Sequence, residues 1–160
     1  MLIEAFYVER DMLELVNDER VLSEAPPLQE HPGVRHEYSE QLRDWLRRDD
    51  PDELWDPPPA ADERARAVRG LGVEVVHDRL ACFDLDLGDM LDPDVDVPRG
   101  LTAAMVESLL EGPSFAAPLR DPAATQVGLV VVHQSIATTP ISWTTWVGAL
   151  LVRASPTGGG

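Results

Sequence analysis

Several residue types are missing from this sequence or nearly so. It contains no lysine, one asparagine and one cysteine, Cys82. A single cysteine excludes an intrachain disulfide and a cysteine-rich metal site, and it favours a reducing compartment. The longest apolar run, around Val127 to Val132, is far too short to cross a bilayer, and the first residues carry no basic leader. We therefore expect a cytoplasmic protein that makes no membrane contact.

The lack of lysine means that all 13 basic residues are arginine, beside abundant alanine, aspartate, valine and proline. This bias is typical of codon usage in a GC-rich genome, such as that of an actinobacterium or one of its phages. It indicates a source and says nothing about phosphate recognition. A phage origin would extend the expected location to the virion.

Positive charge is scarce relative to negative charge. The 29 acidic residues leave a net charge of -16. Such a field repels nucleic acid and anionic membrane surfaces, and it favours basic protein surfaces or metal ions. We therefore expect a protein partner or a homo-oligomer, with no direct binding of nucleic acid.

The length of 160 residues suits one compact domain, and 44% hydrophobic residues are enough to form a core. We expect a single α+β domain over 1–155 and a flexible glycine-rich tail over 156–160. Proline and acidic residues predict three loops, 23–34, 49–61 and 88–100.

Apolar residues recur at helical spacing in three places. The clearest pattern covers 36–48 and ends before Pro51, which disfavours helical geometry in the residue before it. A shorter helix is expected over 62–68, and another begins at Thr102 as N-cap and ends at Gly112. The first residues, 2–8, favour a strand that leads into a further helical stretch.

Alternation of apolar and polar residues predicts the strands. Residues 81–87 have this pattern, while residues 73–78 are rich in β-branched side chains, and the two runs on either side of Arg79 predict a β-hairpin. Two more β-rich runs, 126–133 and 143–153, should pair as antiparallel neighbours. The sum is an α+β fold, with a mainly antiparallel sheet of four or five strands and about three helices packed on one face.

An Asp-x-Asp pair is the sharpest candidate for chemistry. Asp84 and Asp86 alternate along a predicted strand, about 7 Å apart at the usual rise per residue, and Asp89 could supply a third carboxylate. Such a site would hold Mg²⁺ or Mn²⁺ for phosphoryl or nucleotidyl transfer, or for hydrolysis. The alternative is that the pair forms the solvent face of a strand, and the sequence lacks a P-loop that would place a nucleotide.

No other catalytic constellation is apparent, so we assign no catalytic residue and no required cofactor. His77 and His133 lie near expected strand ends and would meet only if the two hairpins are neighbours. Cys82 shares a predicted strand face with Asp84 and Asp86, whose negative charges oppose thiolate formation.

Tryptophans are the strongest binding signal. Trp55 lies in an acidic proline-rich stretch, and Trp143 and Trp146 follow a polar loop and alternate between strand faces. We expect these three residues to contact a partner. The favoured function is a non-catalytic protein-interaction or assembly module, an accessory, regulatory or phage structural component. The alternative is the small metal-dependent enzyme.

Overall fold

A computed structural model describes residues 2–4, 6–47, 61–86, 97–135 and 142–155. None of its described helices is long and apolar enough to cross a membrane. The helices and strands in these ranges are β1 (Leu2–Glu4), α1 (Phe6–Leu22), β2 (Gln29–Glu30), α2 (Pro32–Leu46), α3 (Ala61–Arg69), β3 (Val73–Asp86), α4 (Val97–Glu111), α5 (Ala116–Arg120), β4 (Gln126–Ser135) and β5 (Ser142–Ala154).

The described strands form one sheet in the order β1-β4-β5-β3. All pairs along this order are antiparallel, while the short β2 runs parallel to β4 beside β1. The α+β class and the mainly antiparallel sheet are therefore confirmed. The expected antiparallel pairing of the last two strands is confirmed too, with Val131 opposite Val147 in the register.

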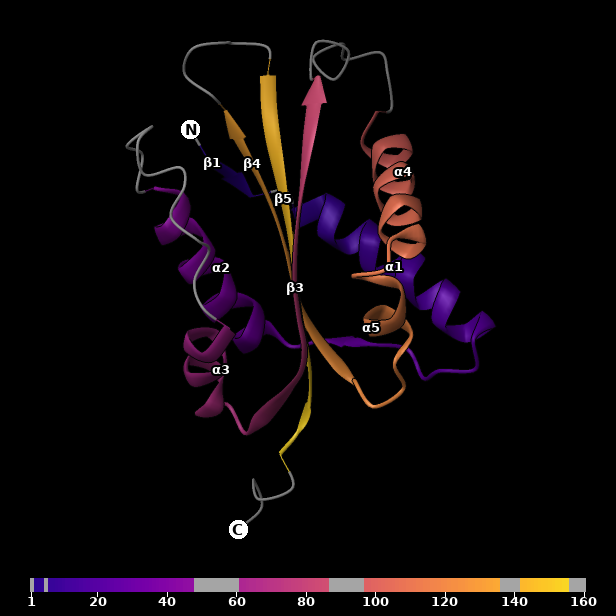
Figure 1. The fold of residues 1–160 in the computed structure, drawn as a ribbon, viewed down its shortest axis with the longest axis vertical. Coiled ribbons are helices and arrows are strands. Elements are labelled where there is room, and N and C mark those ends of the chain that lie inside the picture. Colours follow the sequence, from indigo (N-terminus) through magenta and orange to yellow (C-terminus); the bar gives the residue numbers. More distant parts are fainter. Residues whose placement is uncertain (1, 5, 48–60, 87–96, 136–141, 156–160) are drawn as a thin grey trace.

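The helices lie on both faces of the sheet, where the sequence led us to expect one face. Figure 1 shows the sheet edge-on, with α2 and α3 on one side and α1, α4 and α5 on the other. The reason is that β4 is apolar at both parities. Val127 and Val131 are buried under the α1 side, and Val130 and Val132 under the α2 side. A strand buried on both faces needs two covering layers.

The predicted hairpin around Arg79 is wrong, because residues 73–86 form one continuous strand. The long β5 strand supplies backbone partners along the whole of β3, and Arg79 lies opposite Ala149. One extra residue is absorbed by a bulge between Val75 and His77, which shifts the register without turning the chain.

Two predicted loops contain regular structure. The stretch 23–34 includes β2 and the start of α2, because Pro32 occupies the first helical turn and the His31 imidazole accepts the Val34 N–H at 3.2 Å. Helix α4 begins at Val97, so Thr102 lies inside it and is not its N-cap. Residues 49–60 and 88–96 of the other two predicted loops, and the tail 156–160, lie outside the described residues.

Two glycines let α2 lie close against the sheet. A Cβ on Gly128 would stand 2.7 Å from Val34, and a Cβ on Gly148 would stand 2.5 Å from the Tyr38 ring. Neither distance occurs for real side chains. Both positions therefore require glycine for the observed packing of α2 on β4 and β5.

Candidate functional site

Strand β3 forms one end of the sheet. It pairs with β5 on one side, and in the part of the chain that the structure describes no strand pairs with its other side. In Figure 1 this outer edge is nearest the viewer. With 14 residues, β3 is the longest described strand, so it presents a long row of backbone groups.

Backbone alternation shows which residues of β3 direct their N–H and C=O groups outward. The Val131 N–H points away from β5, because it donates to the Glu9 carboxylate at 2.9 Å. Carried through the β4–β5 and β5–β3 registers, this parity directs the odd residues of β3 beyond the bulge, such as Ala81, toward β5. Even residues beyond the bulge, such as Asp78 and Leu80, direct their N–H and C=O groups to the outer edge. In agreement, the outward C=O of Asp78 accepts a bond from the Arg79 side chain at 2.9 Å.

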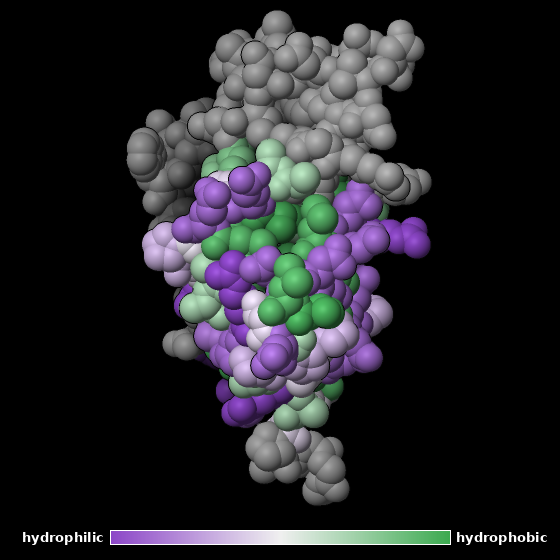
Figure 2. All heavy atoms as spheres, turned by 90° about the vertical axis from the view of Figure 1, so that its right-hand side faces the viewer, coloured by the Kyte–Doolittle hydropathy of each residue, from purple (hydrophilic) through white to green (hydrophobic). Residues whose placement is uncertain are grey.

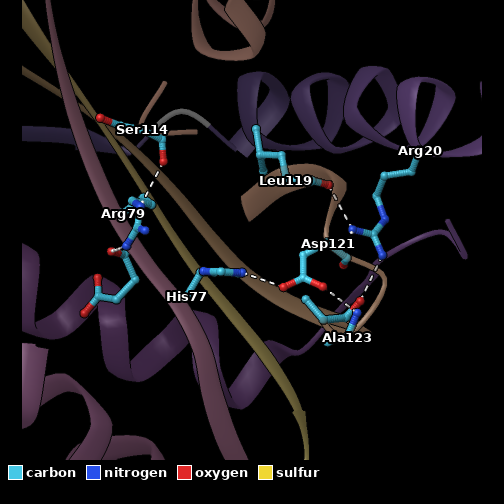
Figure 3. A network of polar contacts seen from close by, with 9 residues as sticks. Arg20, His77, Arg79, Ser114, Leu119, Asp121 and Ala123 are labelled. Carbon is cyan, nitrogen blue, oxygen red and sulfur yellow. Dashed lines mark hydrogen bonds and ion pairs between the residues drawn. The ribbon is translucent and has the colours of Figure 1, made fainter. Parts of the chain in front are cut away.

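Side chains fasten the first half of β3 to the elements on either face. On the α3 face, Arg64 donates to Asp78 at 2.5 Å, and both side chains are more than nine-tenths buried. On the other face, Arg79 donates to the Ser114 carbonyl at 2.9 Å, and His77 contacts Asp121 at 2.7 Å (Figure 3). These contacts involve His77, Asp78 and Arg79, all in the first half of the strand.

A buried arginine holds the segment that contacts His77. The Arg20 guanidinium, with no exposed surface, donates to the carbonyl oxygens of Pro26, Leu119, Asp121 and Ala124 at 2.7 to 3.0 Å (Figure 3). Burial lowers its pKa, while the nearby Asp121 carboxylate opposes that change. Arg20 thus orders the turn between α5 and β4 from inside the protein.

The carboxylate of Asp121 completes this network. It accepts the Ala123 N–H at 2.9 Å and contacts His77 through its second oxygen. The Ala123 bond, followed by the His77 bond, lowers the pKa of Asp121. An Asp–His pair also occurs in catalytic triads. Here one Asp121 oxygen accepts the Ala123 N–H and the other contacts His77, so the pair connects β3 to the α5–β4 turn.

A cleft of about 490 Å³ lies along one edge of β4, in the gap between the segment that pairs with β2 and the segment that pairs with β1. There Glu9 and Arg35 form a double hydrogen bond at 2.8 and 2.9 Å, and Arg35 also lies 4.5 Å from the centre of the Phe6 ring. Because Glu9 also accepts the Val131 N–H, its carboxylate replaces a strand partner in the gap. The Glu9–Arg35 pair thus joins α1 to α2 across the edge of β4.

Apolar side chains gather at the centre of the face that α1, α4 and α5 form, and polar side chains surround them (Figure 2). The crevice among them is lined only by apolar residues, including Met12, Leu109 and Phe115. It offers about 10 Å³ of free space, which is about enough for one water molecule. This crevice is a packing defect and not a ligand pocket.

The structure locates two of the three predicted metal ligands only by their backbone. Asp84 lies opposite Thr144 and Asp86 opposite Ser142 in β3. Their side chains and the whole of Asp89 lie outside what the structure describes. Within the described residues, no three His, Cys, Asp or Glu side chains are grouped to hold a metal ion. The Mg²⁺ or Mn²⁺ site therefore stays a prediction.

The three tryptophans have different placements. Trp146 packs edge-on against Trp45 with 5.1 Å between ring centres, and its N–H donates to Gln134 at 3.1 Å. It thus belongs to the cluster under α2. Trp143 lies opposite Leu85 in the register, but its side chain and all of Trp55 lie outside the described residues. A partner contact by these residues stays a prediction.

The two candidate histidines do not meet. His77 lies opposite Leu151 and His133 opposite Thr145, six positions apart along β5 or about 20 Å at the usual rise per residue. His133 bonds to Thr145 at 2.7 Å, and burial lowers its pKa. Cys82 is exposed.

Sequence reasoning missed the residues that organise the edges of the sheet. Arg20 continues a helical row of buried residues, Val8, Met12 and Val16, at intervals of four. A charged residue in line with an apolar stripe was a usable signal for a buried guanidinium. The Glu9–Arg35 pair had no comparable signal, because its two residues belong to different helices and no local spacing links them.

No known family model matches the chain, and no curated protein has a matching sequence.

Proposed function

We propose that this chain is a non-catalytic protein-interaction or assembly module that docks its partner along the outer edge of β3. It would serve as an accessory, regulatory or phage structural component, in the cytoplasm or in a virion. The observation that carries the proposal is the place of a 14-residue strand at the end of the sheet. An uncovered strand edge is a template for pairing with another chain, and strand addition is a recurring mode of protein recognition.

Two further features support this proposal. The first half of β3 is braced by Arg64 on one face and by Ser114 and Asp121 on the other, so the edge is held on a rigid base. A preorganised edge loses little conformational freedom when a partner strand binds. The net charge of -16 also favours a protein partner over nucleic acid or an anionic membrane.

The proposal is tested on the purified protein in two steps. Light scattering over a range of concentrations measures self-association. A library of cyclic β-hairpin peptides is then selected for binding, and hydrogen exchange locates the amides that each binder protects. The blocking variant is Leu80→Pro, which removes an outward N–H, and the matched control is Leu80→Ala, which keeps it.

The proposal predicts self-association or peptide binding that protects the outward amides of β3, that Leu80→Pro abolishes and that Leu80→Ala retains. A monomer with no ligand on β3 would refute it. A rise in melting temperature with millimolar Mg²⁺ or Mn²⁺ that Asp84→Asn removes would instead favour the metal-dependent enzyme.

A further inference from the structure

We infer that the strand that docks on β3 is a basic segment of a different protein and not a second copy of this chain. This inference rests on the proposed function. It follows from the parity of the acidic residues along β3 and from the charge of the whole chain.

The acidic residues in the second half of β3 occupy outward backbone positions. Asp84 and Asp86 are even-numbered, as is Asp78, and beyond the bulge the even residues direct their N–H and C=O groups to the outer edge. Asp84 and Asp86 belong to the second half of this edge and are two residues, or about 7 Å, apart along the strand.

A second copy is a poor partner for this edge. In a two-fold antiparallel pairing of β3 with itself, even positions lie opposite even positions. The registers centred on residues 84 and 85 then set Asp84 directly opposite Asp84 or Asp86 of the other copy, whereas Asp78 is already paired with Arg64. Like charges directly opposite each other destabilise a strand pair, and two copies that each carry -16 repel at longer range.

A partner strand with arginine or lysine at alternate positions replaces the repulsion across the strand pair, and the long-range repulsion, with attraction. Each opposite-charge pair across the two strands increases affinity by up to about five-fold, and two such pairs by up to about 25-fold. The long-range field also speeds the encounter with a cationic partner, and added salt weakens this effect. Backbone pairing with residues 80–86 sets the position of the basic side chains.

The test uses three cyclic β-hairpin peptides of equal length and the full chain. The first has arginine at alternate positions of its pairing strand, the second has glutamine there, and the third is the arginine peptide with its outward amides N-methylated. Affinities are measured by fluorescence anisotropy at two salt concentrations. Hydrogen exchange shows whether the amides of residues 80–86 become protected. The protein variant Asp84→Asn with Asp86→Asn is the charge control.

We expect the arginine peptide to bind about 10-fold or more tightly than the glutamine peptide, and the double variant to lose most of this difference. The N-methylated peptide should not bind, because it cannot pair with the backbone. Equal binding of the N-methylated peptide would overturn the inference, since it would indicate diffuse charge attraction. Protection of β3 by the glutamine peptide with equal affinity, or a dimer formed through β3, would overturn the basic partner while leaving the proposed function standing. If no peptide protects β3 and the chain stays monomeric, the proposed function falls as well.

Discussion

Proline substitutions at two adjacent positions of β3 should have very different effects on stability. The backbone parity places the Ala81 N–H in the ladder with β5 and directs the Leu80 N–H outward. Proline removes the N–H at either position. Only at Ala81 does this remove a bond that the sheet uses.

The magnitude follows from what each substitution leaves behind. At Ala81, the lost bond faces Val147, which is fully buried, so its carbonyl loses a donor where water cannot replace it. An unsatisfied buried carbonyl costs about 1 to 3 kcal/mol, and the ring adds strain, so we expect Ala81→Pro to cost about 3 kcal/mol or more. Leu80→Pro also truncates a partly buried side chain, so it is compared with Leu80→Ala. We expect these two to differ by no more than about 1 kcal/mol.

The assay is urea unfolding followed by tryptophan fluorescence, with thermal melts as a second measure. For a chain of this size, about 3 kcal/mol corresponds to a decrease in melting temperature of roughly 6 to 12 °C. If Leu80→Pro proved as damaging as Ala81→Pro, the assigned parity would be wrong, and the outer edge of β3 would be engaged by some other part of the protein. A harmless Ala81→Pro would contradict the β3–β5 pairing itself.

Three further substitutions test other parts of the structure. Glu9→Ala should reduce the free energy of unfolding by about 3 kcal/mol, because it leaves the largely buried Arg35 charge without its carboxylate; a loss below about 1 kcal/mol in urea unfolding would show the pair to be solvated. Gly148→Ala should cost about 1 to 3 kcal/mol, since the new methyl group overlaps the Tyr38 ring, and an unchanged melting temperature would contradict the close approach of α2. The lowered pKa of Asp121 contributes stability that is present above the ordinary carboxyl pKa of 3.8 and is lost as the pH falls through its lower folded value. The stability advantage of the wild type over Asp121→Asn should therefore shrink below about pH 4, and a constant difference from pH 6 to pH 3 would refute this link.

The elements that the sequence predicted well are those with a strong local pattern. β4 and β5 were identified from dense β-branched residues, and the amphipathic stripe of α2 from Tyr38, Leu42 and Leu46, which are all buried. The start of α2 was missed, because the proline that reads as a loop signal also suits the first turn of a helix. The hairpin in β3 was a similar error, since a charged residue in mid-strand resembles a turn.

The candidate site was predictable only in part. The sequence suggested a protein-interaction module, but it could not show which strand forms an edge of the sheet. It selected Asp84 and Asp86 by their alternation, and the register now gives their backbone positions. The apolar row ahead of Arg20 could have indicated that its guanidinium is buried, but not its partners, which are carbonyl groups about a hundred residues away along the chain.

The sequence by itself determined the α+β class, the acidity and the apolar content of each strand, because these depend on composition and on periods of two or 3.6 residues. The tertiary structure alone decided that helices cover both faces, that β3 ends the described sheet and that, beyond its bulge, the even residues of β3 direct their backbone groups to the outer edge. Strand order and edge exposure depend on contacts between distant segments. A local pattern records that a side chain is buried, but not which neighbour buries it.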